Sequence, residues 1–426
     1  MKRTSVFAAI LVVMLGLTAC TQPASGEVIQ SEKQRSTSPD VSQAELAALV
    51  NGNSTFTFDL YQELRKEDND NLFYSPYSIS LALAMTYAGA RSETAQQMSD
   101  ALRFSLPQDR LHPAFNSLDI ELAQRGATSQ GKDGDGFRLN IVNAIWGQND
   151  YQFLDQFLDV LAENYGAGLR ILDFASAPEE SRTIINDWVS DQTEGRIEDL
   201  LPQGLINALT RLVLTNAIYF NAAWQYPFVE EATYDGTFYL LEGNETIVPM
   251  MRQTESFGYA DGDGYQAIEL PYDGRELSMV VLLPARDHFE SFETSLDAQQ
   301  VDAILGSLEQ REINLTMPRF EFESDFGLKK TLSALGMPVA FSTDDADFSG
   351  MTGNRDLFIA DVVHKAFVSV DEAGTEAAAA TAVVMAPTVA PHMPINVNID
   401  HPFIFLIRDI ETGAILFVGR VVNPGA

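Results

Sequence analysis

The stretch from residue 371 to residue 394 joins two kinds of sequence that place opposite demands on a fold. It reads DEAGTEAAAATAVVMAPTVAPHMP, and residues 376–385 are small or apolar with no charge after Glu376. Such a segment can be buried on either face of a sheet. Three prolines between residues 387 and 394 withhold backbone donors and favour extended, exposed backbone. A segment able to enter a core therefore leads directly into one that should remain outside it.

Two conformations fit the first half of this stretch. Alanine is the best helix former, so propensity alone favours a helix from about residue 372 to residue 385. Gly374, however, is a poor residue for a first helical turn. A period of two places Glu376 on one face, and the opposite face then holds Thr375, Ala377, Ala379 and Thr381. That alternation is typical of a strand whose small residues pack inward.

Residues 372–381 resemble the hinge of the reactive-centre loop of serpins, the family of serine protease inhibitors. In that family the loop is bait: a target protease cuts it, and the hinge then inserts as a new central strand of a large sheet. The resemblance implies a reactive-centre loop over about residues 372–400. It also implies a hinge formed by Glu372, Gly374, Thr375, Glu376, Ala377, Ala378, Ala379, Ala380 and Thr381.

The resemblance extends over nearly the whole chain after residue 50. Residues 71–94 match the second helix of the family, which begins at Ser75 with a proline just inside it. Residues 212–224 match the third strand of the main sheet, and their near-continuous apolar side chains predict burial on both faces. Residues 401–424 match the C-terminal signature, a hairpin that turns at residues 411–413. We therefore expect one mixed α+β domain over residues 41–426, with the serpin fold, about three β-sheets and eight or nine helices.

Periodicity of the apolar residues predicts further elements. Helical spacing indicates an opening helix over residues 42–64 and helices over 151–165 and 326–335. Strand-like runs include residues 313–322 and 361–370.

His364 lies inside the second of these strands, where the usual interpretation is a hydrogen-bonded core histidine. By resemblance it belongs to a cluster beneath the point where the main sheet opens, together with Asn216, Ser75 and Ser78. Buried polar groups need mutual partners, so both interpretations predict the same chemistry. The resemblance also implies that Trp224 lies where the hinge first enters the sheet.

The N-terminus has the anatomy of an export signal. Two basic residues precede a short apolar run, and residues 17–20 read Leu-Thr-Ala-Cys, which resembles a bacterial lipobox with Cys20 as the lipidated residue. A plain secretory signal and a short membrane anchor are the alternatives. Cys20 is the only cysteine, which excludes an internal disulfide. We expect a signal peptide over residues 1–19, a disordered tether over 20–40, and export to the outer side of a bacterial membrane or to the periplasm or medium.

A formal net charge of −33 excludes whole classes of partner. Nucleic acids and anionic lipid surfaces need clustered Lys and Arg, as does a polyanionic activator of the heparin kind. The acidic surface fits a saline habitat or simply good solvation.

Two Asp-Gly clusters, at residues 133–136 and 261–264, predict turns rather than calcium loops. The five histidines have no metal-ligand spacing, so no metal or cofactor is expected.

The sequence carries none of the motifs of a zinc hydrolase, a phosphate-binding loop or a serine hydrolase. The small inward hinge residues instead imply a suicide-substrate inhibitor, acting as a monomer on a serine protease. The alternative is a non-inhibitory serpin that acts as a surface binding or chaperone-like protein, although hinges of that kind tend to carry charge, proline or bulk.

The family's spacing from Glu372 places the reactive bond between Thr388 and Val389, with Ala386, Val389 and Met385 as alternative cut residues. The small apolar run before this bond resembles substrates of elastase-like and subtilisin-like proteases. No Lys or Arg lies between Lys365 and Arg408, which disfavours trypsin-like targets.

Overall fold

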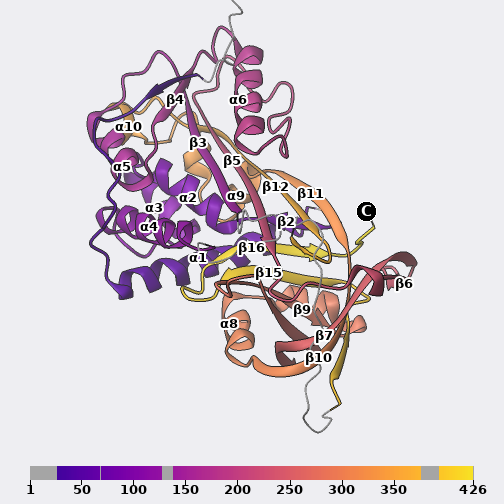
Figure 1. Cartoon of the computed structure of the whole chain (residues 1–426). Coiled ribbons are helices and arrows are strands. Elements are labelled where there is room, and N and C mark those ends of the chain that lie inside the picture. The colour runs from indigo at the N-terminus through magenta and orange to yellow at the C-terminus, as the bar shows by residue number, and fades with distance from the viewer. Residues whose placement is uncertain (1–25, 68, 127–137, 376–392, 426) are drawn as a thin grey trace, which may run out of the picture.

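The computed structural model describes residues 26–67, 69–126, 138–375 and 393–425. These residues form ten α-helices and sixteen strands, so the mixed α+β class is confirmed (Figure 1). Helices α1 to α5 lie on one side of a large twisted sheet and α6 (Pro178–Gln192) on the other, and a second sheet forms the other end of the molecule. Among the described residues no helix is both long enough and apolar enough to span a bilayer.

One helix, α2 (Pro76–Tyr87), lies at the centre of the molecule. All of its residues are buried between the two sheets and the other helices. The predicted start of α2 is confirmed, because the Ser75 hydroxyl accepts a hydrogen bond from the backbone N–H of Ser78 and Pro76 occupies the first turn. The other helices are α1 (Gln43–Leu64), α3 (Ser92–Ala101), α4 (Gln108–Ala123), α5 (Asp155–Tyr165), α6 (Pro178–Gln192), α7 (Phe289–Ser295), α8 (Ala298–Gly306), α9 (Lys329–Ala334) and α10 (Ser349–Thr352).

The seven-stranded sheet holds the candidate site. Its strands lie in the order β1 (Glu27–Ile29), β4 (Leu169–Leu172), β3 (Arg138–Gln148), β5 (Leu212–Ala223), β13 (Gly374–Thr375), β12 (Ile359–Val370) and β11 (Phe320–Gly327). The central strand β5 is buried on both faces, as its apolar run predicted. Leu214 and Ile218 face the main core, whereas Val213 and Ala217 face a smaller core beneath α6.

The nine-stranded sheet follows the path β14 (Ile395–Asn398), β10 (Glu309–Pro318), β7 (Glu245–Gly262), β8 (Tyr265–Pro271), β9 (Leu277–Pro284), β15 (Phe403–Asp409), β16 (Ile415–Val421) and β2 (Leu72–Tyr74), with β6 (Tyr234–Tyr239) paired to β7. We expected about three sheets, but the described strands form two, because continuous hydrogen bonding joins two of the expected sheets into one. The cause is the 18-residue strand β7, which pairs with β6, β8 and β10 along its length.

Three predicted elements differ in their bounds. The helix expected over residues 151–165 is α5, which begins only at Asp155 because Leu154, its N-cap, has extended backbone. The strand expected over residues 313–322 is two strands, because the chain leaves β10 at Pro318 and enters the other sheet as β11 at Phe320. The helix expected over residues 326–335 begins later, at Lys329, because Phe326 still belongs to β11 and pairs there with His364 of β12. Helical periodicity alone cannot locate such a change, because short apolar runs fit either structure.

The segment expected to be a free tether is ordered from residue 26 onward. Residues 27–29 form β1, which pairs antiparallel with β4 at the edge of the large sheet. Lys33 forms ion pairs with Asp159 at 3.1 Å and Glu163 at 2.8 Å, and Arg35 pairs with Asp119 at 2.6 Å. Composition reflects only how much apolar surface a segment can bury. Residues 26–35 are held instead by backbone pairing at the edge of the sheet and by acidic partners on α4 and α5. Cys20 lies outside the described residues.

Candidate functional site at the hinge and the β5–β12 seam

The centre of the large sheet is closed along most of its length and open at one end. Residues 359–366 of β12 pair in parallel with residues 212–218 of β5, and we call this pairing the β5–β12 seam. Beyond the seam, the two-residue strand β13 fills the gap: Gly374 pairs with Ala223, while Thr375 pairs with both Ala222 and Val370. The hinge therefore already occupies the first positions of a new central strand.

A tight turn brings the chain back from β12 into β13. The Asp371 carboxylate accepts hydrogen bonds from the backbone N–H groups of Ala373 at 2.8 Å and Gly374 at 3.1 Å. Burial raises the pKa of that carboxyl, and the two N–H donors partly offset this effect. A Cβ atom on residue 374 would overlap the carbonyl oxygen of Ala222, so only glycine fits between the strands here.

Aromatic side chains cover the point of entry. The Trp224 indole N–H donates to the carbonyl of Asp371 at 3.0 Å, and its backbone N–H donates to that of Ala373 at 2.8 Å. The indole stacks on Tyr272 with ring centroids 4.7 Å apart. The Tyr272 hydroxyl lies 2.9 Å from Oγ1 of Thr375. Trp224 thus contacts residues 371 and 373 directly, just before β13 begins.

Glu372 anchors the residues before the hinge. Its side chain is almost fully buried, and its carboxylate pairs with the guanidinium of Arg319 and accepts a hydrogen bond from the hydroxyl of Thr233. Its backbone carbonyl accepts the N–H of Phe228 at 2.8 Å. A buried carboxylate requires such partners. Arg319 and Thr233 were not among the residues that the sequence singled out, since neither is near Glu372 in the chain.

A buried polar cluster lies across the β5–β12 seam. His364 on β12 is directly opposite Asn216 on β5, and its Nδ1–H donates to the Asn216 side-chain oxygen. The Nε2 atom of His364 accepts the backbone N–H of Ser75 at 3.2 Å, and the Asn216 amide donates to Oγ of Ser78 at 2.6 Å. Burial lowers the pKa of His364 to about 3, so the imidazole is neutral at physiological pH. The structure therefore brings together all four residues that the resemblance grouped.

Asn143 is a fifth member of this cluster that the sequence reasoning missed. It lies on β3 directly opposite Asn216, whose amide donates to its side-chain oxygen. Ser78 Oγ lies 3.2 Å from the same oxygen, and the Asn143 amide donates to the Ser78 carbonyl at 3.2 Å. The available signal was an asparagine inside the apolar run of residues 141–145.

Several predicted site residues lie outside the described part of the chain. These are the hinge residues Glu376, Ala377, Ala378, Ala379, Ala380 and Thr381, and the reactive-bond residues Met385, Ala386, Thr388 and Val389. Of the two Asp-Gly clusters, residues 261–264 form the turn between β7 and β8, whereas residues 133–136 are also outside the description. Within the described ranges, no group of three or more His, Cys, Asp or Glu side chains could hold a metal ion.

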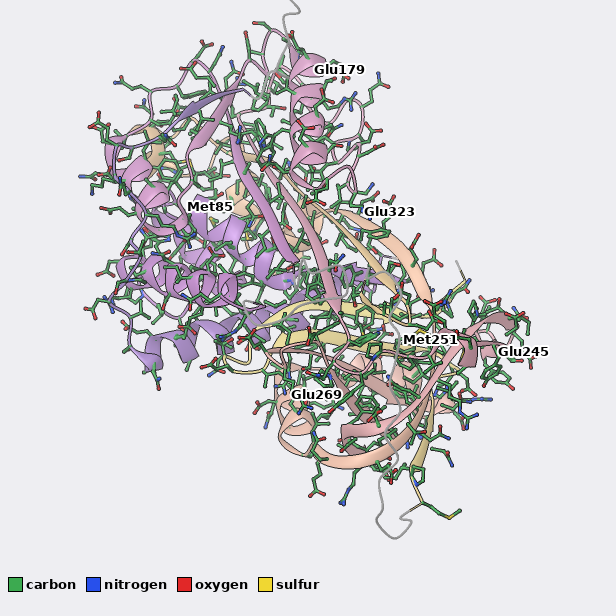
Figure 2. All side chains as sticks on the ribbon, viewed as in Figure 1. Met85, Glu179, Glu245, Met251, Glu269 and Glu323 are labelled. Carbon is green, nitrogen blue, oxygen red and sulfur yellow. The ribbon has the colours of Figure 1, made fainter. Side chains whose placement is uncertain are left out.

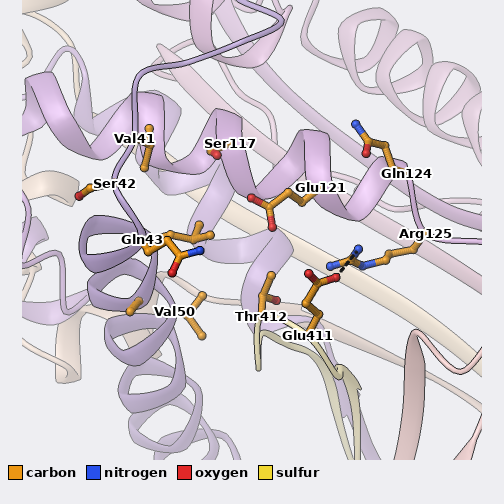
Figure 3. Close-up of a pocket in the computed structure, with 12 residues that line it drawn as sticks. Val41, Ser42, Gln43, Val50, Ser117, Glu121, Gln124, Arg125, Glu411 and Thr412 are labelled. Carbon is orange, nitrogen blue, oxygen red and sulfur yellow. Dashed lines mark ion pairs between the residues drawn. The ribbon is translucent and has the colours of Figure 1, made fainter.

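A separate cleft of about 620 Å³ lies between α1, α4 and the turn after β15 (Figure 3). Arg125 crosses it and forms an ion pair with Glu411 at 3.0 Å, and a second with the buried Asp409 at 2.6 Å. Burial raises the pKa of Glu121, which lines the same cleft. Arg125, the cationic side chain among the described residues that line this cleft, is therefore already paired with two carboxylates. The cleft shares no residue with the β5–β12 seam.

The strands β5 and β12 are thus paired at the centre of the large sheet and part at one end, where β13 lies between them. A family model described as Serpin (serine protease inhibitor) matches residues 51–424. The chain belongs to the serpin family and has the serpin fold.

Individual relatives agree with this membership. An uncharacterized serpin-like protein of Thermococcus kodakarensis is 43% identical over 378 residues, covering 88% of this chain and 86% of that protein. The leukocyte elastase inhibitor of Equus caballus is 41% identical over 88% of this chain and 99% of its own. The native structure of the thermophilic serpin tengpin has a TM-score of 0.79 at 28% identity, covering 93% of this chain and 97% of its own. Uncleaved ovalbumin has a TM-score of 0.78 at 29% identity, covering 88% of this chain and 100% of its own.

Proposed function

We propose that this protein inhibits serine proteases of small-apolar specificity as a suicide substrate, by loop cleavage, acyl-enzyme trapping and insertion of the hinge into the seam. The observation that carries this proposal is β13, which pairs antiparallel with β5 at the open end of the seam. Each residue that follows Thr375 can extend the same pairing one step toward Leu212.

The register defines what full insertion requires. Gly374 pairs with Ala223, so an antiparallel extension would bring Met385 opposite Leu212, eleven residues along each strand (223 − 212 = 385 − 374). Thr375 is buried against Tyr272 in the main core. By alternation, the residues that would point the same way are Ala377, Ala379 and Thr381. All are small, and each new ladder hydrogen bond contributes about 1 kcal/mol net.

The uncut protein stores this free energy behind a kinetic barrier. A serine protease that attacks the loop becomes esterified at the cut residue, which frees the hinge from the downstream chain. Insertion then competes with hydrolysis of the ester. If insertion is faster, the attached protease is displaced while its oxyanion hole and triad are distorted, and the ester persists. If insertion is slower, the protein is cleaved as an ordinary substrate.

The polar cluster supplies part of the barrier. Insertion must separate β5 from β12, and this separation breaks the contact between Asn216 and His364. Both groups are fully buried, so they would lose their partners before the new strand could replace them. We assign Ser75, Ser78, Asn143, Asn216 and His364 to the task of holding the seam closed until the loop is cut.

The target class follows from the loop sequence and the relatives. We place the reactive bond between Thr388 and Val389, after the small apolar run Met385-Ala-Pro. Two relatives of about 40% identity are named leukocyte elastase inhibitors, which supports an elastase-like or subtilisin-like target. We further propose that the protein is exported, is lipidated at Cys20, and acts as a monomer without a polyanionic activator.

The decisive experiment mixes the exported domain with elastase-like, subtilisin-like and trypsin-like proteases and looks for a denaturant-resistant complex. We expect such a complex with the first two classes. Mass spectrometry of the peptide released should show a fragment that begins at Val389. Cleavage without any resistant complex would overturn inhibition, and a tight complex with trypsin alone would overturn the target class.

A further inference from the structure

His401 lies at the downstream end of the reactive-centre loop, between β14 and β15. Its side chain is buried, and both nitrogens of its ring lie within hydrogen-bond distance of an oxygen atom. Nδ1 is 2.8 Å from Oδ1 of Asp400, and Nε2 is 2.7 Å from the backbone carbonyl oxygen of Pro284, the last residue of β9. The insertion mechanism itself gives this residue no task.

The two partners of the ring determine its charge. A carbonyl oxygen only accepts hydrogen bonds, so Nε2 must carry a proton, and an ionised carboxylate requires the same of Nδ1. Burial acts to raise the pKa of the Asp400 carboxyl, but the hydrogen bond from His401 and the charge of Arg286 hold that pKa below its ordinary value. Asp400 is therefore ionised, and His401 is an imidazolium that donates on both sides.

Asp400 joins three further parts of the chain. Its Oδ2 atom accepts hydrogen bonds from Arg286 at 2.6 Å and from the side-chain amide of Asn398 at 2.8 Å. Its backbone carbonyl accepts the N–H of Tyr239, at the end of β6, at 2.8 Å. The Arg286 guanidinium in turn lies 3.7 Å from the centre of the Tyr239 ring. We call these contacts of Asp400 and His401 the downstream anchor.

Few other ionisable groups lie near the downstream anchor. Asp287 and His288 share the short 3₁₀ helix η2 (Arg286–His288) with Arg286, but both are exposed. In the described ranges neither of their side chains forms a hydrogen bond to residues 398–401. Tyr265 lies opposite Pro284 on β8, and its ring packs against Phe292 with centroids 5.5 Å apart. The charge of the anchor is therefore set by Asp400, Arg286 and His401.

The strand before the anchor, β14, is weakly held by its own pairing. It is four residues long, lies at the end of the nine-stranded sheet and pairs in parallel with residues 313–316 of β10. Val397 is its one buried side chain. Figure 2 shows the side chains of this part of the molecule, with Met251 labelled on β7, the strand on the other side of β10. A short edge strand with little buried surface opens easily. The downstream anchor therefore decides how firmly this end of the loop is held.

We propose that His401 is a positioning residue for the reactive-centre loop: its imidazolium form fixes the downstream end of the loop, and its neutral form releases that end and slows inhibition. The inference rests on the proposed inhibitory function and adds a response to pH. A neutral ring has one donor for two acceptors, so either Asp400 or the Pro284 carbonyl loses its partner. Histidine is the side chain that changes charge near neutral pH, so the anchor weakens as the pH rises. A loop that is loose at one end loses more conformational freedom when a protease binds it, which slows binding.

The test measures the second-order rate constant of inhibition of one elastase-like protease at about pH 6.5 and about pH 9, where carboxylates stay ionised and Lys and Arg stay protonated. His401→Arg keeps a cation at both pH values, and His401→Gln has none at either. Asp400→Asn supplies an amide that can donate to Nδ1 of a neutral ring, so this variant should lose the pH response without a change at residue 401. His288→Gln is the matched control, because it removes an exposed histidine from η2. Comparison of variant and parent at the same pH cancels the protease's own dependence on pH.

Relative to His401→Arg, we expect inhibition by the parent protein to slow by about threefold to tenfold between the two pH values, as for the loss of one hydrogen bond. His401→Gln should inhibit slowly at both, and His288→Gln should follow the parent. Amide hydrogen exchange of residues 395–401 should be faster in the parent than in His401→Arg at the higher pH and equal at the lower one. The number of inhibitor molecules consumed per protease should stay constant, because the hinge is untouched.

Two results would contradict these expectations in different ways. If the parent kept the same rate relative to both His401→Arg and Asp400→Asn at the two pH values, His401 would have no positioning role, while inhibition itself would stand. A parent protein that forms no resistant complex at either pH would instead overturn the proposed function.

Discussion

The Tyr272 hydroxyl lies 2.9 Å from Oγ1 of Thr375, so a residue at the end of β8 in one sheet holds the last described residue of the hinge in the other. Burial raises the pKa of Tyr272, which keeps the hydroxyl protonated and able to donate. The same ring stacks on Trp224, whose indole binds the carbonyl of Asp371. The start of the new strand is therefore defined in the uncut protein, before any protease has acted.

Replacement of Thr375 by arginine should convert the inhibitor into a substrate. Thr375 is 1% exposed, so a guanidinium there would be a buried charge with no partner at the first step of insertion. We expect cleavage to continue while the number of inhibitor molecules consumed per protease rises by about tenfold or more. Thr375→Ser, which keeps the hydroxyl near Tyr272, is the control. Retained inhibition by Thr375→Arg would mean that the loop does not insert along this path.

Gly374→Ala should expel β13 from the sheet. The added Cβ would overlap backbone atoms of Ala222 and Ala223, which cannot move without disturbing β5. Overpacking of this kind costs about 1–3 kcal/mol, so the thermal midpoint of the uncut protein should fall. Gly306→Ala is the matched control, because no atom lies within 4 Å of its added Cβ. Equal midpoints for the two variants would contradict the placement of β13.

Asn216→Ala should weaken the seam. It removes the partner of His364 and leaves the Asn143 and Ser78 side chains with fewer contacts, at a cost of about 1–3 kcal/mol. We expect faster loss of inhibitory activity when the uncut protein is incubated at elevated temperature. Asn314→Ala, at an exposed hydrogen bond to Asn396, serves as the control. If Asn216→Ala and the control lost activity at the same rate, the polar cluster would not contribute to the kinetic barrier.

Stability should decline as the pH falls below about 6.5. Burial lowers the pKa of His364 to about 3 and, together with the charge of Arg91, that of His112 to about 4, from an ordinary value of 6.5. Between the folded and unfolded pKa values, each of these two histidines therefore binds a proton in the unfolded chain but not in the folded chain. The stabilisation is complete above pH 6.5 and is lost toward pH 4, by up to about 1.4 kcal/mol per pH unit for each histidine.

Thermal midpoints at a fixed scan rate between pH 7 and pH 5 would measure this effect, because most carboxylates stay ionised there. His112→Gln removes one of the two titrating groups, so its midpoint should depend less steeply on pH than that of the parent protein. A slope equal to the parent's would exclude His112 as a contributor.

Cys20→Ser should move the protein from the membrane fraction to the soluble fraction. The expectation follows from the lipobox-like residues 17–20, whose cysteine would carry the lipid. Cell fractionation with Ser25→Ala as control gives the answer. An unchanged membrane fraction would contradict lipidation as the anchor.

The sequence predicted those parts of the fold that depend on local signals. Ser75 and Pro76 start α2, and the apolar run of β5 is buried on both faces. Positions that depend on distant partners could not be predicted. The pairing of Glu372 with Arg319 joins residues 53 positions apart (372 − 319), and Asn143 meets Asn216 only because β3 and β5 are neighbours. Residues 26–40 looked too polar to order, yet an edge strand and two acidic helices supply their partners.

The register of the large sheet gives the insertion a direction relative to the N-terminus. Glu27 pairs with Ile171, Ile171 with Gly147, and Gly147 with Leu212, so the first strand and the far end of the seam share one row. Three strand spacings separate them, roughly 14 Å. Full insertion would end in the row of Glu27, next to the first described residue of the chain, Gly26. If the protein is anchored to a membrane through its N-terminus, insertion would move the attached protease toward that membrane. The inserted strand and the N-terminal anchor would then bear the same mechanical force.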